Sequence, residues 1–395
     1  MKPMSRRNAL KGIAALAAGS SFAGRISAAP SQTAPDRRIP LVHLTDLYHP
    51  PQDPDDHLDL ATLYGLPEYD LRGVVLDVTR KFLVGKPDGW DIPRDPGYVP
   101  VAQLNHLTGR AVPAAMGPID PLTHPGDDAR DRPVAEQAGI ALLLDVLERS
   151  VEPVTISVVG SGRVLAAAYN RAPELVLAKT RTVLLNAGAT GGPKREWNAG
   201  LDPAAYLSLW RSGLPLDWYP CGTDRSAFDP VHERGTFWKV PHAVLFRDLA
   251  DGLRAWIGLA FTGSLRGDVI RALSESGRGA AWEQVLAGER NMWATVSLVL
   301  GAGRVLAKTP EGWRFLPAAE AAGMELWPLR HDPIRATVDD DGHVNWTTTA
   351  EDSNRRLFGR KPGADYGLAM ADALNALFRE IVVHPLDLQR AAPKS

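Results

Sequence analysis

The sequence predicts an α/β protein with a mostly parallel open sheet and helices on both faces of that sheet. Two observations support this fold class. Short apolar runs alternate along the chain with segments of helical periodicity, which is typical of successive βαβ units. In addition, the run at 154–159 is rich in β-branched residues and contains no charge, which favours a strand buried on both faces.

The first half of the chain alternates predicted strands with predicted helices. An apolar strand at 39–44 turns through prolines into a helix at 58–64. A β-branched strand follows at 71–78, and a loop rich in Gly, Pro and Asp covers 87–100. The alternation continues with a helix at 101–107, a strand at 112–117, a helix at 134–150, the strand at 154–159, a helix at 163–170 and a strand at 182–186.

The second half opens with a well-marked helix start at Asp202-Pro203, since proline is favoured at the first helical position. A strand at 216–219 and helices at 248–261, 268–273 and 283–300 follow. Beyond residue 301 the pattern predicts short strands and one closing amphipathic helix, at 304–307, 335–338, 344–347 and 366–381.

The N-terminus resembles an export signal. Residues 5–11, SRRNALK, match the twin-arginine pattern, and an Ala/Gly-rich segment at 12–23 precedes small residues at 27–29 that suit cleavage. The apolar segment is too short and its side chains are too small for a stable membrane anchor. We therefore expect a periplasmic or secreted protein with three parts: a twin-arginine signal peptide at 1–29, a linker at 30–38 and an α/β domain at 39–395.

Composition excludes several classes of protein. The formal net charge is −2, which argues against a nucleic-acid partner held by phosphate attraction. The one cysteine, Cys221, excludes an internal disulfide and a cysteine-rich metal site, and a semi-buried thiol is the expected environment. A small molecule remains the expected partner, and a homo-oligomer is compatible with the sequence.

An acidic stretch at 45–61 links the first strand to its helix and contains no Lys or Arg. Carboxylates crowded in this way repel one another, so some must bind protons or share a cation. A hard metal ion such as Ca²⁺, which prefers oxygen ligands, is the natural partner. The alternative is that Asp53 or Asp55 caps the helix and the others are solvated. The carboxylates are those of Asp46, Asp53, Asp55, Asp56 and Asp59.

The order of these motifs resembles the inosine-uridine preferring nucleoside hydrolases. The resemblance covers roughly residues 41–300 and begins with a strand ending in Asp46, Asp55-Asp56 opening a helix, and the Gly73-Val74-Val75 strand. Its most specific part is Glu196-Trp197-Asn198 followed by Asp202-Pro203. This part is similar to the family's Glu-Phe-Asn followed by Asp-Pro, which grips the ribose.

The resemblance implies a calcium site and a sugar site. Asp46 would be a calcium ligand and the base that activates water, and Asp56 would be a bidentate calcium ligand. The carbonyl of Val159 would be a backbone ligand to the same ion. Asp55 would contact a ribose hydroxyl. The remaining sugar contacts would come from Glu196 and Asn198, for which a helix-flanking surface turn is the alternative.

Three departures from the family pattern bear on substrate choice. The family's last calcium ligand is an aspartate that follows a histidine at a helix start. Here Arg290-Asn291 is the better match, with an amide oxygen of Asn291 as ligand, and His331-Asp332-Pro333 is the alternative. Arg290 cannot protonate a leaving base as a histidine can. In addition, Arg80-Lys81 stands where the family has Gly-Asn.

These observations predict an exported, metal-dependent hydrolase that cleaves the N-glycosidic bond of a ribonucleoside or a related glycosyl compound. Trp197 or Trp293 would stack on the base or the sugar, and core packing is the alternative for Trp293. His49 and His57 are expected to be surface loop residues. The alternatives from other classes are a non-catalytic periplasmic protein that binds nucleosides or sugars, and a calcium-stabilised structural protein.

Overall fold

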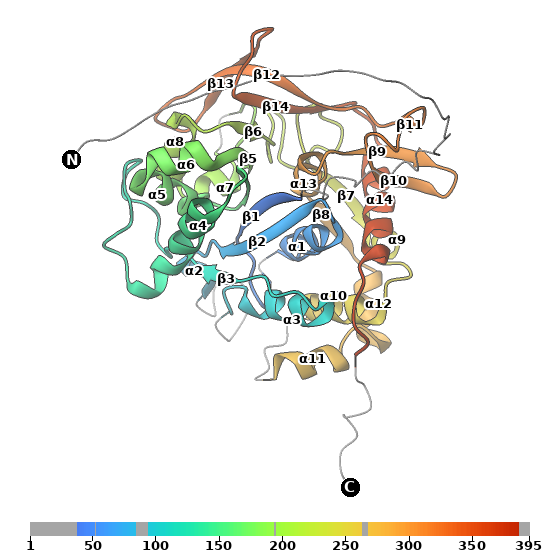
Figure 1. Ribbon diagram of the computed structural model, residues 1–395. Helices are drawn as coiled ribbons and strands as arrows, with labels where there is room; N and C mark the ends of the chain where they lie inside the picture. The colour runs from blue at the N-terminus through green and yellow to red at the C-terminus, as the bar shows by residue number, and fades with distance from the viewer. Residues whose placement is uncertain (1–37, 52, 84–93, 193–194, 263–267, 387–395) are drawn as a thin grey trace, which may run out of the picture. The chain divides into compact units, whose positions relative to one another are not determined.

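A nine-stranded sheet forms the centre of the described residues, in the order β13-β12-β14-β6-β5-β4-β1-β2-β3 (Figure 1). The structure is a computed structural model that describes residues 38–51, 53–83, 94–192, 195–262 and 268–386. The nine strands are β1 (Ile39–Thr45), β2 (Tyr69–Leu76), β3 (Ala114–Met116), β4 (Val154–Val159), β5 (Thr180–Asn186), β6 (Leu216–Trp218), β12 (Leu329–Val338), β13 (Val344–Thr348) and β14 (Arg355–Arg360).

Strand direction is uniform across the sheet except at β12. From β3 to β14 every neighbouring pair is parallel, and β1 lies between β2 and β4 with Thr45 opposite Leu76 and Val159. Only β12 runs antiparallel to its neighbours β13 and β14. The predicted mostly parallel sheet is confirmed, and its parallel strands end at one edge, where ligand crevices form in open α/β sheets.

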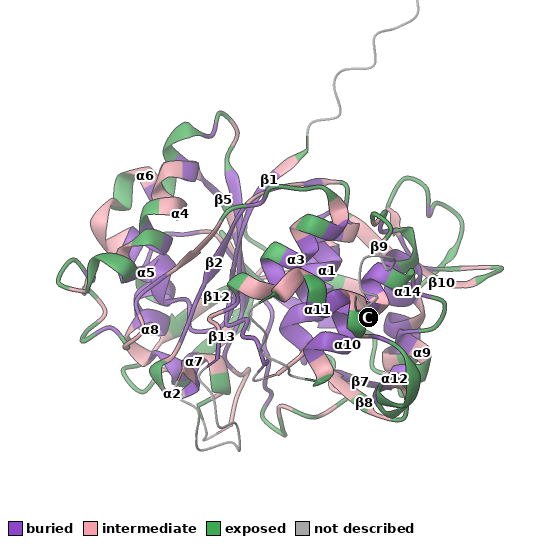
Figure 2. Cartoon of the chain, turned by 90° about the horizontal axis from the view of Figure 1, so that it is seen from below, coloured by how far each residue is buried: buried purple, intermediate pink, exposed green. Residues whose placement is uncertain are grey.

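Helices cover both faces of the sheet, as predicted (Figure 2). One apolar cluster joins one face to α4 (Ala138–Arg149), α5 (Arg163–Arg171), α6 (Pro173–Lys179) and α8 (Pro203–Arg211). A second cluster joins the other face to α1 (Asp55–Gly65), α3 (Tyr98–Thr108), α10 (Asp251–Thr262), α13 (Thr295–Gly301) and α14 (Tyr366–Glu380). Both faces are therefore buried, which explains the apolar character of β1 and β4.

Shorter elements complete the described residues. Two small sheets contain β10-β9-β11 and β7-β8. Their strands are β7 (Trp238–Pro241), β8 (Glu289–Met292), β9 (Arg304–Thr309), β10 (Gly312–Pro317) and β11 (Glu325–Leu326). The remaining helices are α2 (Arg80–Leu83), η1 (Val134–Gln137), α7 (Trp197–Leu201), α9 (His242–Leu245), α11 (Val269–Glu275) and α12 (Gly279–Leu286).

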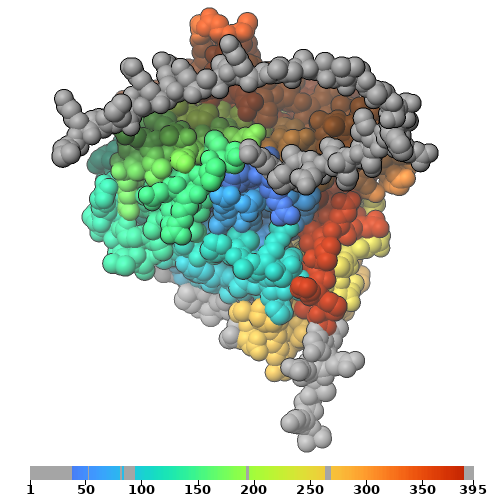
Figure 3. Space-filling model, in the orientation of Figure 1, coloured from blue at the N-terminus to red at the C-terminus, as the bar shows by residue number. Residues whose placement is uncertain are grey.

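The C-terminal segment returns to α3. In the space-filling view α14, in red, lies beside the cyan surface formed by α3 (Figure 3). After α14 the backbone N–H of His384 donates a hydrogen bond to the carbonyl of Leu107 at 2.6 Å. This contact fixes the end of the described chain against the face of the sheet that carries α1.

One predicted helix is wrong. The segment 283–300 contains the end of α12, the strand β8 and the start of α13. Asn291 lies within β8, where it pairs with Lys239 of β7, and so it does not stand at a helix start. The apolar spacing that indicated one helix therefore comes from two helices separated by a strand.

The N-terminal predictions lie outside the described residues. The signal peptide at 1–29 and nearly all of the linker at 30–38 fall in this category, and the predicted division into three parts stays a prediction. Among the helices that the structure describes, none combines the length and the hydropathy needed to span a bilayer.

Candidate active site

A cavity of about 290 Å³ lies at the carboxyl ends of the parallel strands, close to the lower end of small-molecule site volumes. It combines a cluster of carboxylates with several aromatic rings. Seven of the eight predicted site residues line it. The lining residues are Asp46, Asp53, Asp55, Asp56, Val159, Glu196, Trp197, Asn198, Cys221, Ala227, Phe228 and Trp293.

The ends of β1 and β4 place the first acidic residues. The backbone N–H of Asp46 donates to the carbonyl of Val159 at 3.2 Å, which joins the two strand ends. The hydroxyl of Thr45 donates to Asp56 Oδ1 at 3.3 Å and so orients the first turn of α1 toward β1. Asp46, Asp56 and Val159 therefore line the same cavity.

Neither Asp53 nor Asp55 is the N-cap residue of α1, contrary to the alternative that one of them caps this helix. Its N-cap residue is Pro54, which offers no side-chain hydrogen bond to the helix. Asp53 Oδ1 accepts a long hydrogen bond of 3.4 Å from the N–H of Asp55. Asp55 and Asp56 lie in the first turn, where the helix dipole favours negative charge. Both are nevertheless buried and line the cavity.

Burial makes these carboxylates difficult to ionise without a partner. Burial, followed by the nearby charge of Asp77, raises the pKa of Asp46 to about 8. Burial and the neighbouring acids also raise the pKa values of Asp55 and Asp56 well above the usual range. The compensating cation among described residues is Arg290, whose Nη1 lies 3.3 Å from Asp53 Oδ1. The cavity therefore carries excess negative charge whenever its acids are ionised.

Asp77 borders this cluster from the end of β2. It is 2% exposed and accepts hydrogen bonds from the Ser161 hydroxyl, at 2.7 and 2.8 Å, and from the Gly162 N–H at 3.1 Å. A Cβ atom at Gly160 would lie 3.0 Å from Asp77 and 3.5 Å from Asp46. Gly160, at φ 144°, therefore allows β4 to pass close to both acids.

Glu196 and Asn198 enter the cavity from the start of α7. Glu196 is the N-cap of this helix, and its carboxylate accepts backbone N–H groups of Gly188 at 2.7 Å, Asn198 at 3.1 Å and Ala199 at 3.2 Å. The Asn198 amide donates to the Asn186 carbonyl at the end of β5, at 2.9 Å. This pair therefore forms the helix-flanking turn that the alternative expected, and the same turn lines the cavity. The contacts of Glu196 and Asn198 with sugar hydroxyls stay a prediction.

Aromatic rings border the polar part of the cavity. Trp197 is 51% exposed and its ring lies 6.2 Å from that of Phe82. Trp293 packs edge-on against Phe228 at 5.5 Å and against Phe237 at 5.2 Å, and its Nε1 donates to the Ala227 carbonyl. Trp293 thus packs in an aromatic cluster, as the alternative expected, and it also lines the cavity, while its stacking on a base or sugar stays a prediction.

The remaining candidates lie elsewhere. Asn291 is not among the described residues that line the cavity, and α13 begins after Trp293 and Ala294 without a carboxylate. His331 contacts the Tyr219 hydroxyl at 2.7 Å, and Asp332 pairs with Arg234, so this motif belongs to the β12–β14 region.

The two flanking histidines are buried, contrary to the expectation of surface loop residues. His49 is 2% exposed and pairs through its backbone with Asp95. His57 is 1% exposed and packs against Trp256 at 5.4 Å between ring centroids. Neither histidine is among the described residues that line the cavity.

Sequence reasoning missed several lining residues. Asp53 lines the cavity, whereas Asp59 accepts a hydrogen bond from Thr295 at 3.1 Å. Cys221 is 6% exposed and lines the cavity. No local signal marks Ala227 or Phe228, because a polar loop brings them to the cavity through tertiary contacts. Cys221 follows the parallel strand β6 closely, and this position could have indicated that it lines the cavity.

The donor set is compatible with a hard divalent cation. Asp46 and Asp56 supply two carboxylates and Val159 supplies a carbonyl, and oxygen ligands of this type suit Ca²⁺. No cluster of three or more His, Cys, Asp or Glu side chains with the arrangement of a metal site occurs in the described part of the chain. Water or a bound hydroxyl compound would have to complete the coordination of an ion held by Asp46, Asp56 and Val159.

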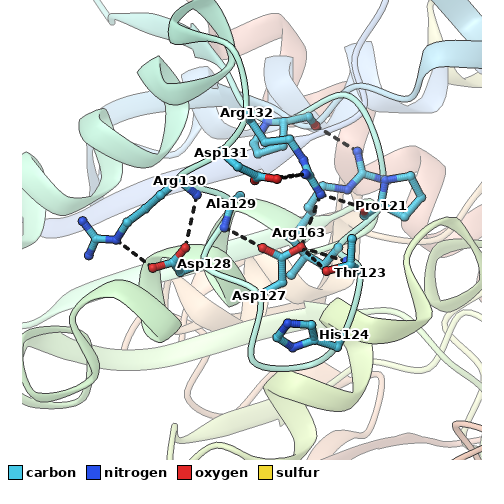
Figure 4. A network of polar contacts seen from close by, with 12 residues as sticks. Pro121, Thr123, His124, Asp127, Asp128, Ala129, Arg130, Asp131, Arg132 and Arg163 are labelled. Carbon is cyan, nitrogen blue, oxygen red and sulfur yellow. Dashed lines mark hydrogen bonds and ion pairs between the residues drawn. The ribbon is translucent and has the colours of Figure 1, made fainter.

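A buried ion pair connects the start of α5 to the start of α8. Arg163, at the start of α5, is fully buried and donates from Nε to Asp202 at 2.7 Å and from Nη1 to the carbonyls of Val78, Pro118 and Ile119. The loop after Pro121 folds onto the same region through its own carboxylate–arginine contacts, such as that between Arg132 and Asp127 (Figure 4). These contacts hold the loops that follow β2 and β3 against α8.

Comparison with known proteins identifies relatives of this chain. No family model matches it. The chain is 31% identical over 142 residues to the non-specific ribonucleoside hydrolase RihC of Salmonella newport, and 32% identical over 142 residues to the RihC of Salmonella enteritidis. Each match covers 31% of this chain, and the chain spans 45% of the length of these curated relatives.

Solved structures extend the comparison to the whole fold. The purine-preferring ribonucleoside hydrolase from Gardnerella vaginalis superposes with a TM-score of 0.51 at 15% identity, covering 86% of this chain and 99% of that chain. An inosine-guanosine nucleoside hydrolase gives 0.50 at 13% identity, covering 88% and 99%. The chain therefore shares the fold of these nucleoside hydrolases, and a 142-residue part of it is similar in sequence to a ribonucleoside hydrolase.

Proposed function

We propose that this protein is a hydrolase that cleaves the N-glycosidic bond of a ribonucleoside or a related glycosyl compound. The observation that carries the proposal is the convergence of two distant segments on one cavity. Asp46, Asp55 and Asp56 come from the β1–α1 connection, while Glu196 and Asn198 come from the start of α7. Cleavage of such a bond develops positive charge on the sugar, and carboxylates around the ring stabilise that charge.

Asp46 is the proposed general base. It stands at the strand end, it is 6% exposed, and its carboxyl faces neighbouring acids that favour uptake of a proton. A base with a pKa near neutrality can accept a proton from water in the transition state. Asp46 would therefore take the proton of the attacking water, while Glu196 and Asn198 hold the sugar hydroxyls.

A divalent cation fits the same arrangement. Asp46, Asp56 and the Val159 carbonyl are the residues that would hold it, and Ca²⁺ is the proposed ion. When bound, such an ion lowers the pKa of water and attracts sugar hydroxyl oxygens. Its charge would also relieve the repulsion among the buried acids.

We further propose that the chain reaches the periplasm or the medium by the twin-arginine route, on the basis of SRRNALK at 5–11.

The test is an assay of product release. Purified mature protein with Ca²⁺ is incubated with a panel of ribonucleosides, and free base and free ribose are measured by chromatography beside calorimetric titration of each compound. Release of both products in equal amounts supports the proposal. Binding of a nucleoside without product release would contradict it and indicate a non-catalytic binding protein.

A further inference from the structure

A second cavity, of about 480 Å³, lies beside the candidate active site and is not used by the function proposed above. One part of its wall is the loop after β5, at 188–192. Another part is the tip of the hairpin that β12 and β13 form at the edge of the sheet (Figure 1). Glu196 lines this second cavity and also lines the first cavity beside Asn198. The two cavities therefore share Glu196 as a wall.

Side-chain contacts hold the hairpin tip on the loop after β5. The Trp346 Nε1 donates a hydrogen bond to the Thr190 carbonyl at 3.1 Å. Arg195 donates from Nε and Nη2 to the Asp341 carbonyl at 3.2 and 2.5 Å. The second cavity is therefore fixed by contacts between distant segments, and a ligand that enters a preformed site loses less free energy to ordering of the protein.

The backbone that orients Glu196 belongs to the second cavity. The Glu196 carboxylate accepts the N–H groups of Gly188 at 2.7 Å and Ala199 at 3.2 Å, and both donors come from residues that line the second cavity. The carboxylate proposed to hold sugar hydroxyls therefore stands between the two cavities. A ribose held at Glu196 lies next to the second cavity, so a substituent on that ribose can enter it.

The lining of the second cavity mixes hydrogen-bond donors with acceptors. The Arg195 guanidinium only donates, while the exposed carboxylates of Asp339 and Asp341 are acceptors. His343 and Asn345 each carry both kinds of group. A phosphate or an ammonium group would meet a charge of its own sign here. A hydroxyl both donates and accepts, so a neutral group with several hydroxyls matches this lining.

Trp346 adds an apolar surface to these polar groups. Its side chain is half-buried and lines the cavity, and Arg234 lies over its ring at 5.5 Å from the ring centroid. Together with the Nε1 hydrogen bond, this contact fixes the ring. The C–H groups of a sugar gain free energy when such a ring removes them from water. The volume lies within the range of small-molecule sites and exceeds that of the first cavity.

We propose that the second cavity binds a neutral sugar unit attached to the ribose, so that the preferred substrate is an O-glycosylated ribonucleoside. This inference rests on the proposed hydrolase function, and the N-glycosidic bond that breaks is the same. The ribose would lie at Glu196 and Asn198, and the second sugar would lie between Asn345 and Trp346 of β13 and the loop at 188–192. A ligand that reaches both cavities gains a second set of contacts without a second loss of translational freedom.

The experiment compares adenosine with its O-glycosylated derivatives on the wild-type protein with Ca²⁺. The derivatives carry a β-D-ribofuranosyl or a β-D-glucopyranosyl unit on the 2′, 3′ or 5′ oxygen, which covers every free hydroxyl of the ribose. Release of adenine gives kcat/KM for each compound. Calorimetric titration gives Kd for each compound, and this measurement does not require cleavage.

At least one derivative is expected to exceed adenosine by about tenfold or more in kcat/KM and in affinity, since one or two neutral hydrogen bonds contribute that much. Asn345→Ala should lower kcat/KM for this derivative about fivefold more than that for adenosine, the equivalent of one such bond. Trp346→Ala should reduce the preference further. Thr347→Ala is the matched control, because Thr347 is exposed on the same strand and is not among the described residues that line the cavity.

The outcomes separate this inference from the proposed function. Cleavage of adenosine, with no derivative better cleaved or more tightly bound, would overturn the inference and leave the hydrolase intact. Tighter binding of a derivative without adenine release would support the second cavity as a sugar site and overturn the hydrolase. Neither cleavage nor preferential binding would overturn both. If Trp346→Ala does not fold, Asn345→Ala decides, and an unchanged preference in that variant contradicts the inference.

Discussion

The N–H of Asp46 donates a hydrogen bond to the carbonyl of Val159 at 3.2 Å and thereby joins the carboxyl ends of β1 and β4. This contact places a strand-end carboxylate and a strand-end carbonyl in the same cavity. The first turn of α1 then adds Asp55 and Asp56 from the same connection. The acidic part of the cavity is therefore determined by the ends of β1 and β4 together with the start of α1.

Calcium is expected to stabilise the protein through Asp56. A ligand that binds only the native state raises its stability by mass action, by about 2.7 kcal/mol at a hundredfold excess over Kd. Added Ca²⁺ should therefore raise the Tm of the wild-type protein in differential scanning fluorimetry, and chelation should reverse the rise. Asp56→Ala should abolish this calcium-dependent shift.

The matched control for this measurement is Asp145→Asn, because Asp145 lies on the surface of α4 in a pair with Arg149. This variant should keep the full calcium-dependent rise in Tm. An unchanged rise in Asp56→Ala would show that the ion binds elsewhere.

The buried His43 should make the protein less stable in acid. His43 is 0% exposed, its Nδ1 lies 3.2 Å from the Ser157 hydroxyl, and burial lowers its pKa to about 3. The unfolded state binds a proton below about pH 6.5, whereas the folded state does not until about pH 3. The contribution of this residue is thus complete above about pH 6.5 and is lost as the pH falls toward 3.

Denaturant titrations at neutral pH and at about pH 4.5 measure this effect, which is expected to be on the order of 2 kcal/mol. His43→Gln removes the titrating group, so its stability should fall less between the two pH values than that of the wild-type protein. The acids of the cavity are present in both proteins, so their contributions cancel in the comparison. Parallel pH profiles for the two proteins would exclude His43 as the cause.

The ion pair between Arg163 and Asp202 should be costly to break. Both side chains are 0% exposed, and Asp202 also accepts the N–H groups of Ala205 and Leu122. Removal of one charge from a buried pair leaves the other uncompensated and costs about 3–5 kcal/mol. Asp202→Asn should therefore lower the free energy of unfolding by about 3 kcal/mol or more in urea denaturation.

Asp340→Asn provides the surface comparison, because Asp340 is 95% exposed and pairs with Arg211. Loss of this exposed pair should change the free energy of unfolding by less than about 1 kcal/mol. Similar losses in both variants would mean that burial does not determine the importance of the Arg163–Asp202 pair.

The sequence predicts those features that depend on local pattern. The strands β1, β2, β4 and β5 follow apolar runs, and the start of α8 follows Asp202-Pro203, where the Asp202 side chain accepts the Ala205 N–H. Strand ends next to acidic residues also indicated Asp46. These signals suffice because each depends on neighbours in the chain.

Features that depend on distant contacts were not predictable in this way. β8 forms through pairing with β7, which explains why the segment around Asn291 is a strand within a stretch of helical spacing. β14 likewise lacks a local apolar signal, and its charged residue Arg356 pairs with Asp217 on β6. Phe228 reaches the cavity from a polar loop. Partners far away in the chain decide these three outcomes.

The most direct test of the central claim is the rate of ribose release by the wild-type protein and by Asp46→Asn, with p-nitrophenyl β-ribofuranoside and a nucleoside that the wild type cleaves. Loss of a general base lowers kcat by about 10²–10⁴-fold. We predict a loss of this size in Asp46→Asn with an unchanged circular dichroism spectrum, and wild-type activity in Asp145→Asn. Equal rates in the wild-type protein and in folded Asp46→Asn would contradict the account.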